Sequence, residues 1–257
     1  MSKGKFVWHE LMTTDVAAGG AFFSEVIGWK TQKVEEMDYT MLLVGELPAA
    51  GLMTLPEMAA KAGAPPHWMG HIEVPDAEAA SKRAVELGGK VLAPTQTIPN
   101  VGSFAILADP QGVAFSAFQP ANSEDRPKAE GNGTITWNEL NTTDWESAWK
   151  FYSELFGWET TETMDMGPEF GTYHMFKDAG SEQPVGGMSN HAKSQGFPAH
   201  WAYYINVDDL DAALERVKTH GGKLLNGPME VPGGDKVAQC VDPQGAAFAL
   251  HWTNKTA

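Results

Sequence analysis

The spacing of apolar residues along this chain switches between patterns typical of strands and of helices. Polar residues and glycines lie at these switches and mark the ends of the predicted elements. The run Phe6-Val-Trp-His-Glu-Leu-Met12, rich in apolar residues, predicts a strand, and the apolar positions 22, 23, 26 and 27 predict a helix behind it. Asp15 is expected to cap this helix, because its carboxylate can accept hydrogen bonds from the free amides of the first turn. Gly28 is expected to end the helix in the left-handed conformation, before another strand.

The same order of strands, a capped helix and glycine-containing turns continues to residue 119. Strands are predicted at 39–44 and 50–53 around a turn at 46–48, followed by a Pro- and Ala-rich loop at 56–66. A strand at 68–74 leads to a second helix, which Asp76 caps and the glycines at 88–89 end. Strands at 90–92, 103–107 and 113–119 follow, the last two around the turn Asp109-Pro-Gln-Gly112. We therefore predict a pair of βαβββ units.

This whole pattern occurs twice. The segment Phe22-Phe-Ser-Glu-Val-Ile-Gly-Trp29 returns 129 residues later as Phe151-Tyr-Ser-Glu-Leu-Phe-Gly-Trp158, and Asp109-Pro-Gln-Gly112 returns 133 residues later as Asp242-Pro-Gln-Gly245. The change of offset places a short insertion at 164–171. A period far above the ~50 residues of solenoid repeats indicates two whole domains. We predict domains at 1–121 and 133–257 with a polar linker at 122–132, paired within the chain as a pseudo-dimer.

Composition excludes several classes of partner. The formal charge is −15 without clusters of Lys and Arg, so nucleic acid and anionic membrane surfaces are not expected to bind. Cys240 is the only cysteine, so no disulfide can form within the chain, and its apolar surroundings predict a small buried side chain. We find no apolar run of the ~20 residues that span a membrane, and a cytoplasmic location is the default expectation.

The repeated motifs resemble those of the vicinal oxygen chelate superfamily, which includes glyoxalase I, extradiol dioxygenases and bleomycin-type antibiotic-binding proteins. The resemblance rests on Thr14-Asp15, Phe22-Phe23, Ile27-Gly28-Trp29 and the Asp109-Pro-Gln-Gly112 turn, with their partners in the second copy. It covers essentially the whole chain and is greatest with the tandem glyoxalase-like proteins of bacteria. It implies an α+β fold of tandem glyoxalase-like domains, each with curved mixed sheets that form a cupped pocket.

The resemblance also implies where a metal would bind. Metal-dependent members carry a His seven residues before the first capping Asp, where this chain has Trp8 and Trp137. The other ligand positions hold Met69 and Ala202, Ser116 and Ala249, and the stretches 51–53 and 187–189, which offer no carboxylate or imidazole. Because a divalent metal needs about three protein ligands, we predict no metal and no cofactor. A displaced metal site at His71 and Glu73, near Glu10, stays open as an alternative.

Strand alternation still defines the face that a metal would have occupied. Glu10 and Glu139 lie on it and are the candidate catalytic bases, although each can equally be a structural hydrogen-bond partner. Aromatic and polar residues of the same face are the candidate ligand contacts, as expected of a small-molecule pocket. They are Trp8, His67, His71, Glu73, Phe118, Trp137, His200, Tyr204, Asn206 and His251.

The function predicted from these residues is metal-independent binding of a small, partly aromatic or hydrophobic molecule, for sequestration or detoxification. One alternative is a glyoxalase-like lyase or isomerase that acts on an α-oxo or vicinal-dioxygen substrate with Glu10 or Glu139 as the base. Another is an interaction protein whose cavities are filled by Trp8 and Trp137. The sequence leaves open whether the protein is an enzyme, because one fold serves many chemistries.

Overall fold

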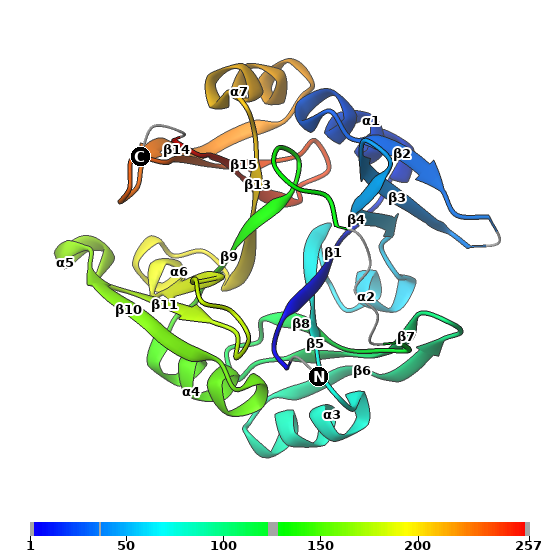
Figure 1. Cartoon of the computed structure of the whole chain (residues 1–257), viewed down its shortest axis with the longest axis vertical. Helices are drawn as coiled ribbons and strands as arrows, with labels where there is room; N and C mark the ends of the chain where they lie inside the picture. Colours follow the sequence, from blue (N-terminus) through cyan, green and yellow to red (C-terminus); the bar gives the residue numbers. More distant parts are fainter. Residues whose placement is uncertain (1–2, 36, 123–127, 255–257) are drawn as a thin grey trace. The chain divides into compact units, whose positions relative to one another are not determined.

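The computed structural model describes residues 3–35, 37–122 and 128–254 and has two mixed eight-stranded sheets, one per copy, which are curved and not closed. The fold is therefore α+β, as predicted. The first sheet has the order β2-β3-β4-β1-β5-β8-β7-β6, and the second has the order β10-β11-β12-β9-β13-β16-β15-β14 (Figure 1). β1 pairs with β4, β5 with β8, β9 with β12 and β13 with β16 in parallel, and the remaining pairs with a described register are antiparallel.

The strands of the first sheet are β1 (Phe6–Thr13), β2 (Lys30–Lys33), β3 (Tyr39–Val44), β4 (Leu47–Thr54), β5 (His67–Glu73), β6 (Lys90–Ile98), β7 (Gly102–Ala108) and β8 (Ala114–Pro120). Those of the second are β9 (Ile135–Asn141), β10 (Glu159–Asp165), β11 (Thr172–Lys177), β12 (Gly186–Ser189), β13 (His200–Asn206), β14 (Lys223–Glu230), β15 (Lys236–Val241) and β16 (Ala247–Trp252).

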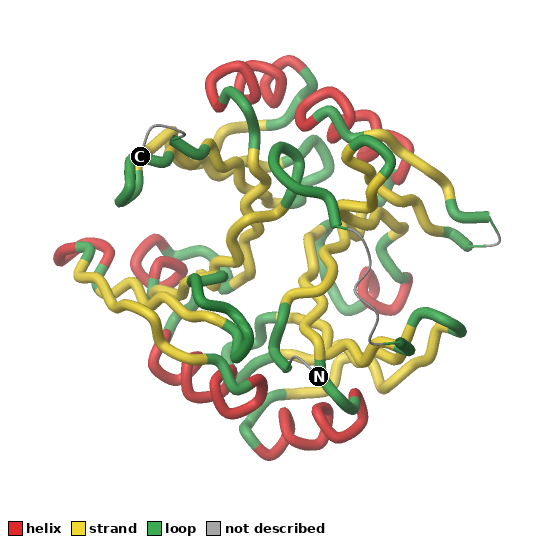
Figure 2. The backbone as a smooth tube through the Cα atoms, in the orientation of Figure 1, coloured by secondary structure: helices red, strands yellow, loops and turns green. Residues whose placement is uncertain are grey.

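Four long helices back these strands: α1 (Val16–Ile27), α3 (Ala77–Glu86), α4 (Trp145–Phe156) and α7 (Leu210–Thr219). Each begins after an aspartate whose carboxylate accepts from a first-turn amide, as predicted for Asp15 and Asp76. Gly28 has φ 86° and ends α1 as predicted. α3 packs on β6, β7 and β8, and α7 packs on β14, β15 and β16 (Figure 2).

Three local predictions were wrong. The predicted turn at 46–48 lies at 45–46, because β4 already begins at Leu47 and pairs Leu47 with Val44. The segment predicted as a loop contains the short helix α2 (Glu57–Lys61), which is supported by an ion pair between Glu57 and Lys61. The strand predicted at 90–92 extends to Ile98, since pairing with β7 carries it past Pro94 through register shifts.

The second copy contains two further short helices, α5 (Gly167–Phe170) and α6 (His191–Gln195). α5 falls within the predicted insertion at 164–171. Of the predicted linker, residues 123–127 lie outside the described residues. Cys240 is fully buried, as predicted, and burial raises the pKa of its thiol to about 12. Among the described residues, no helix is long and apolar enough to cross a membrane.

Contacts between Cα atoms divide the chain into two compact units along lines that differ from the repeat. Unit 1 consists of Met1–Val7, Met69–Asp125 and Trp137–Trp201, and unit 2 consists of Trp8–Trp68, Arg126–Thr136 and Ala202–Ala257. Each unit therefore combines one βαβββ half from each copy.

The tryptophan of each Gly-Trp motif ties these segments together inside a unit. In unit 2 the Trp29 indole N–H donates to the Gly133 carbonyl at 2.8 Å, and in unit 1 the Trp158 indole N–H donates to the Gly4 carbonyl at 2.6 Å. Gly4 and Gly133 both have positive φ, and a Cβ at either would come within 2.9 Å of the indole nitrogen. Only glycine allows this approach without strain.

Candidate functional site

The first candidate site lies in unit 2 and is a chain of three side chains on neighbouring strands. The Trp8 indole N–H on β1 donates to the Tyr39 hydroxyl on β3 at 2.7 Å, and the Tyr39 hydroxyl is hydrogen-bonded to the Glu10 carboxylate. Glu10 is only 7% exposed, whereas Trp8 is half-buried. Of the predicted site residues, the structure thus brings Trp8 and Glu10 together through a tyrosine.

A glycine makes room for this tyrosine. Gly51 on β4 lies directly beside Glu10 in the parallel register. A Cβ at Gly51 would lie 1.8 Å from the Tyr39 hydroxyl oxygen and 2.9 Å from the Trp8 indole nitrogen. The phenol therefore fills the space that a side chain at position 51 would need. Position 51 is among those where the family resemblance implies a metal ligand.

The second candidate site repeats the arrangement in unit 1. The Trp137 indole N–H donates to the Tyr173 hydroxyl at 2.9 Å, and this hydroxyl donates to Glu139 Oε2 at 2.9 Å. Glu139 pairs with Gly187, where a Cβ would lie 2.4 Å from the phenol. We refer to Trp8, Tyr39 and Glu10 as the first triad and to Trp137, Tyr173 and Glu139 as the second triad.

Electrostatics keep the tyrosine of the first triad protonated. Burial raises the pKa of Tyr39 far above its usual value, and the nearby charge of Glu10 raises it further. The phenol consequently stays a hydrogen-bond donor to the carboxylate at any physiological pH. It cannot act as a base, so any proton acceptor in this triad is Glu10.

The two triads differ in the residue two positions after the glutamate. In the second triad Asn141 Nδ2 donates to Glu139 Oε1 at 3.2 Å, and Asn141 pairs with Ser189 on β12. In the first triad the equivalent residues are Met12 and Met53, which pair in the same register on β1 and β4. At these two positions the side chains beside Glu139 are therefore polar, and those beside Glu10 are apolar.

The other predicted ligand contacts have local partners of their own. The His71 ring packs against Phe118 and Phe104 in unit 1, with ring centroids 6.1 and 6.4 Å apart. The backbone N–H and carbonyl of Glu73 bond with Lys5 and Gly4. His67 and His200 each place Nδ1 within 3.0 Å of a proline carbonyl two residues earlier.

In unit 2, Tyr204, Asn206 and His251 also have nearby polar partners. Gln239 Nε2 donates to the Tyr204 hydroxyl at 3.2 Å, and Asn206 Nδ2 donates to Asn132 Oδ1 at 3.2 Å. His251 lies 2.8 Å from the Asp235 carboxylate through Nε2 and 2.8 Å from the Thr136 hydroxyl through Nδ1. Both ring nitrogens of His251 are thereby engaged with the protein.

Metal-ligating side chains do not gather in the described part of the chain. No group of three or more His, Cys, Asp and Glu residues there has the arrangement to hold a metal ion. The side chains at two of the positions implied by the resemblance do not fit a metal either, because the indole N–H of Trp8 and Trp137 is a donor only and Gly51 and Gly187 have no side chain to ligate one.

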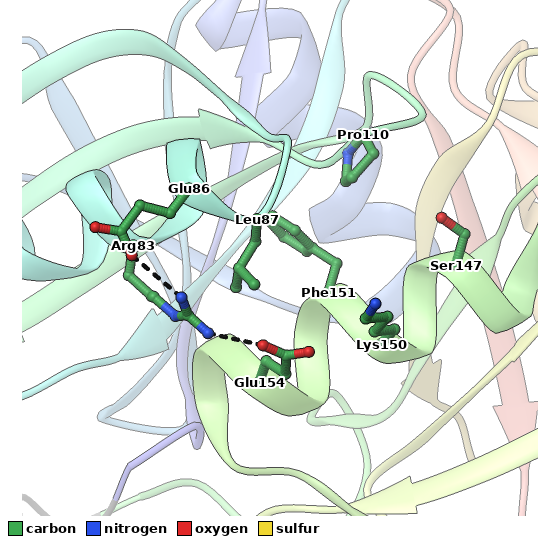
Figure 3. A pocket seen from close by; sticks show the side chains of 8 residues that line it. All are labelled: Arg83, Glu86, Leu87, Pro110, Ser147, Lys150, Phe151 and Glu154. Atoms are coloured by element: carbon green, nitrogen blue, oxygen red, sulfur yellow. Dashed lines mark hydrogen bonds and ion pairs between the residues drawn. The ribbon is translucent and has the colours of Figure 1, made fainter.

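A separate pocket of about 380 Å³ lies in unit 1 between α3 and α4 (Figure 3). Arg83 spans it with ion pairs to Glu86 at 3.1 Å and Glu154 at 2.7 Å, so two carboxylates already neutralise the guanidinium. No residue of either triad lines this pocket. Its lining consists of Arg83, Glu86, Leu87, Pro110, Ser147, Lys150, Phe151 and Glu154.

Tyr39 was not predicted as a site residue from the sequence, whereas Tyr173 was considered as a ligand contact but not as a partner of Glu139. Tyr39 is the first residue of β3 and Tyr173 is the second residue of β11, and the two lie 134 residues apart, close to the repeat offset. The available signal was the presence of Gly51 and Gly187 inside strands, because a strand glycine often marks the close approach of another group.

Comparison with known proteins identifies the family of both copies. Residues 134–250 match the model of the glyoxalase/bleomycin resistance protein/dioxygenase superfamily, and residues 8–118 match that of a glyoxalase-like domain. A relative from Mycobacterium tuberculosis, named "Putative glyoxylase CFP32", is 30% identical over 95% of this chain and 92% of its own length. A relative from Streptomyces peucetius, named "Anthracycline biosynthesis protein DnrV", is 27% identical over 96% of this chain and 92% of its own length.

Solved structures share the fold at low identity. The Mn(II)-bound glyoxalase from Novosphingobium aromaticivorans has a TM-score of 0.66 at 16% identity and covers 98% of this chain and 83% of its own. The catechol dioxygenase BphC has a TM-score of 0.64 at 13% identity and covers 98% and 87%. The chain belongs to the glyoxalase/bleomycin resistance protein/dioxygenase superfamily, that is, the vicinal oxygen chelate superfamily, with two such domains.

Proposed function

We propose that this protein binds small, partly aromatic or hydrophobic molecules at the two triads without a metal ion. The observation that carries the proposal is the hydrogen-bond chain from Trp to Tyr to Glu at the place where related proteins are expected to hold a metal. The chain fixes the orientation of a half-buried indole. A rigid aromatic ring loses little conformational entropy when a planar molecule stacks on it.

The donor set argues against a divalent metal as the binding element. Trp8, Met69 and Ser116 occupy the positions of the expected ligands in the first copy, and Trp137, Ala202 and Ala249 occupy them in the second. Each glutamate is already hydrogen-bonded to a phenol. A planar ligand would be held by stacking and burial, with the carboxylate available for a polar group at its edge.

Titration with a planar aromatic probe tests this proposal. Because a relative is named as an anthracycline biosynthesis protein, an anthracycline is a suitable probe. We expect it to quench tryptophan emission, and Trp8→Ala or Trp137→Ala to weaken binding at its own site by ~1–3 kcal/mol, or about 5- to 150-fold, through lost stacking and burial. Trp252→Ala is the control, since Trp252 is half-buried but belongs to neither triad. No quenching, or equal losses in all three variants, would refute the proposal.

A second candidate is a glyoxalase-like lyase or isomerase with Glu10 or Glu139 as the base. The buried position of both carboxylates favours it, because a base that takes a proton from a carbon next to a carbonyl acts in a site from which water is excluded. Replacement of either glutamate by Gln separates the two functions. A binding protein should keep most of its affinity, whereas an enzyme should lose ~10²-fold or more in turnover of an α-oxoaldehyde. Glu154→Gln, at the exposed end of α4, serves as the matched control.

A further inference from the structure

We propose that the two triads select different ligands, so that the second triad takes a hydroxylated aromatic molecule and the first takes an apolar one. This inference rests on the proposed function, because it assumes that both triads bind planar molecules. The expected difference in ligand choice comes from the side chains beside each glutamate. The two triads themselves consist of equivalent residues.

The side chains beside the two glutamates have opposite chemistry. In the second triad, Asn141 and Ser189 are register partners on adjacent parallel strands, and Ser189 is also the register partner of Tyr173. In the first triad, Met12 and Met53 are partners in the same way, and Met53 pairs with Tyr39. The same backbone positions therefore present an amide and a hydroxyl in one copy and two thioethers in the other.

The side-chain oxygen of Asn141 is a buried hydrogen-bond acceptor that no described residue uses. Its Nδ2 group donates to Glu139 Oε1, while its Oδ1 atom is buried and has no hydrogen-bond partner among residues 3–35, 37–122 and 128–254. A buried acceptor without a partner costs ~1–3 kcal/mol. A ligand that brings a donor to this oxygen recovers that cost, which an apolar ligand cannot do.

Low exposure makes this difference selective. Glu139 is 9%, Ser189 6% and Asn141 0% exposed, so water screens these polar groups little. A site built from buried hydrogen-bonding groups rejects an analogue that lacks the matching hydroxyl far more strongly than an apolar site rejects an added one. Methionine thioethers are weak acceptors and adapt to apolar shapes, so Met12 and Met53 add nothing for a ligand hydroxyl beyond the Glu10 carboxylate that both triads have an equivalent of.

The test uses 2-naphthol and 2-methylnaphthalene, which have nearly the same shape and differ in one hydroxyl. Binding is measured by calorimetry on the full chain, with Trp8→Ala to isolate the second triad and Trp137→Ala to isolate the first. We expect the Trp8→Ala protein to bind 2-naphthol at least tenfold more tightly than 2-methylnaphthalene. The Trp137→Ala protein should prefer 2-methylnaphthalene or discriminate less than threefold.

Exchange of the neighbouring residues completes the test. In the Trp8→Ala protein, Asn141→Met should abolish the preference for 2-naphthol, and in the Trp137→Ala protein, Met12→Asn should create one. If Asn141→Met does not fold, as judged by its thermal melt, Ser189→Ala is measured instead and should reduce the preference at least threefold. Equal preferences at the two triads, or a preference unchanged by these exchanges, would overturn the inference while the proposed function stands. Failure of both probes to bind either isolated triad would overturn the proposed function itself, and the inference with it.

Discussion

Units 1 and 2 contain the same buried motif, but only unit 1 completes it with hydrogen bonds. In unit 1 the Trp201 indole N–H donates to the Tyr152 hydroxyl at 3.2 Å, and this hydroxyl donates to Asp109 Oδ2 at 3.2 Å. In unit 2 the equivalent residues are Trp68, Phe23 and Asp242, so the bridging hydroxyl is missing. Trp68 Nε1 and Asp242 Oδ2 have no hydrogen-bond partner in the described part of the chain.

The ring geometry shows that only this hydroxyl differs. The Tyr152 and Trp201 rings meet edge to face with centroids 5.4 Å apart, and the Phe23 and Trp68 rings do so at 5.4 Å as well. Both aspartates also accept two backbone amides of their own turn through Oδ1. The ring packing is therefore the same in the two units, while the hydrogen-bond network of the motif is complete only in unit 1. Because the hydroxyl is missing in unit 2, two buried polar atoms have no hydrogen-bond partner among the residues described there, and each costs ~1–3 kcal/mol of stability.

The glutamine of the Asp-Pro-Gln-Gly turn also differs between the units, and here it is unit 2 that has the complete set of hydrogen bonds. In unit 2, Gln244 Oε1 accepts from the Thr13 and Thr14 hydroxyls and from the Asp15 amide, and its Nε2 donates to the Asp15 carbonyl at 2.8 Å. In unit 1 the equivalent atoms, Gln111 Oε1 and Thr142 Oγ1, are buried without a partner among the residues described. Each unit thus satisfies one polar network and leaves the other incomplete.

Cutting the chain between the copies should have the largest effect, because it separates the segments of both units. Each unit takes one half from each copy, so fragments 1–121 and 133–257 should each lose most of the ~5–15 kcal/mol that stabilises a native domain. Urea denaturation followed by circular dichroism measures this, and mixing the fragments should restore a cooperative transition. Two stable monomeric fragments without mutual affinity would contradict the expectation.

Exchange of the hydroxyl tests the first difference directly. Tyr152→Phe should lower the free energy of unfolding by ~2–3 kcal/mol, because it removes a buried group that two partners use. Phe23→Tyr should raise it by ~1 kcal/mol, because the new hydroxyl can reach Trp68 and Asp242. Phe22→Tyr is the control: Phe22 is also buried, at 4% exposure against 0% for Phe23, and its ring packs against Phe23 and Phe248. A loss in Phe23→Tyr as large as in this control would show that the two motifs are not equivalent.

The aspartates of the two motifs make the free energy of unfolding depend on pH. Burial raises the pKa of Asp109 to about 6, against ~3.9 in an unfolded chain, and burial also raises the pKa of Asp242. The folded state therefore holds the Asp109 proton more tightly. Its contribution to stability is fully present below about pH 4 and is lost as the pH rises to about 6, at ~1.4 kcal/mol per pH unit.

Asp109→Asn should accordingly flatten the fall in unfolding free energy between pH 4 and pH 6, measured by urea denaturation at several pH values. Asp211→Asn, on the exposed side of α7, should leave the profile unchanged. Tyr152→Phe should extend the fall to higher pH, because the Tyr152 hydrogen bond lowers the pKa of Asp109 and its loss lets that pKa rise further. A profile that is identical in wild type and Asp109→Asn would refute this account.

Truncation of the two glutamines sharpens the second difference and should have the smallest effect. Gln244→Ala should cost ~1–2 kcal/mol, since four partly exposed hydrogen bonds to the start of α1 are lost. Gln111→Ala should cost less than ~0.5 kcal/mol, because its Oε1 has no described partner to lose. Thermal melts of the two variants measure the difference, and equal losses would mean that the turns of both units are held alike.

Much of the fold could be predicted because its signals are local. Asp15 and Asp76 cap their helices through amides three residues away, and Gly28 ends a helix by its own backbone conformation. The repeat then extended these predictions to the second copy. The start of β4 and the length of β6 could not be predicted in this way, because pairing with β3 and β7 decides them.

The candidate site was predictable only in part. Strand alternation placed Trp8 and Glu10 on one face, since side chains two residues apart point the same way. It could not show that Tyr39 joins them, because Tyr39 lies 31 residues from Trp8 and reaches Trp8 and Glu10 only after β3 and β4 pair and Gly51 leaves space for the phenol. The same holds for Tyr173 and Gly187 in the second copy.

The sequence by itself determined the duplication, the order of strands and helices in each copy, the capping residues and the absence of the expected metal ligands at their usual positions. These properties depend on residue type and on short spacings, which any reader of the chain can count. The tertiary structure alone decided which half of each copy joins which compact unit, and which buried polar atoms find partners. Those outcomes depend on single hydroxyls, such as that of Tyr152, meeting groups that lie tens of residues away, and hydrogen bonds of that kind form only when distant strands and helices have packed.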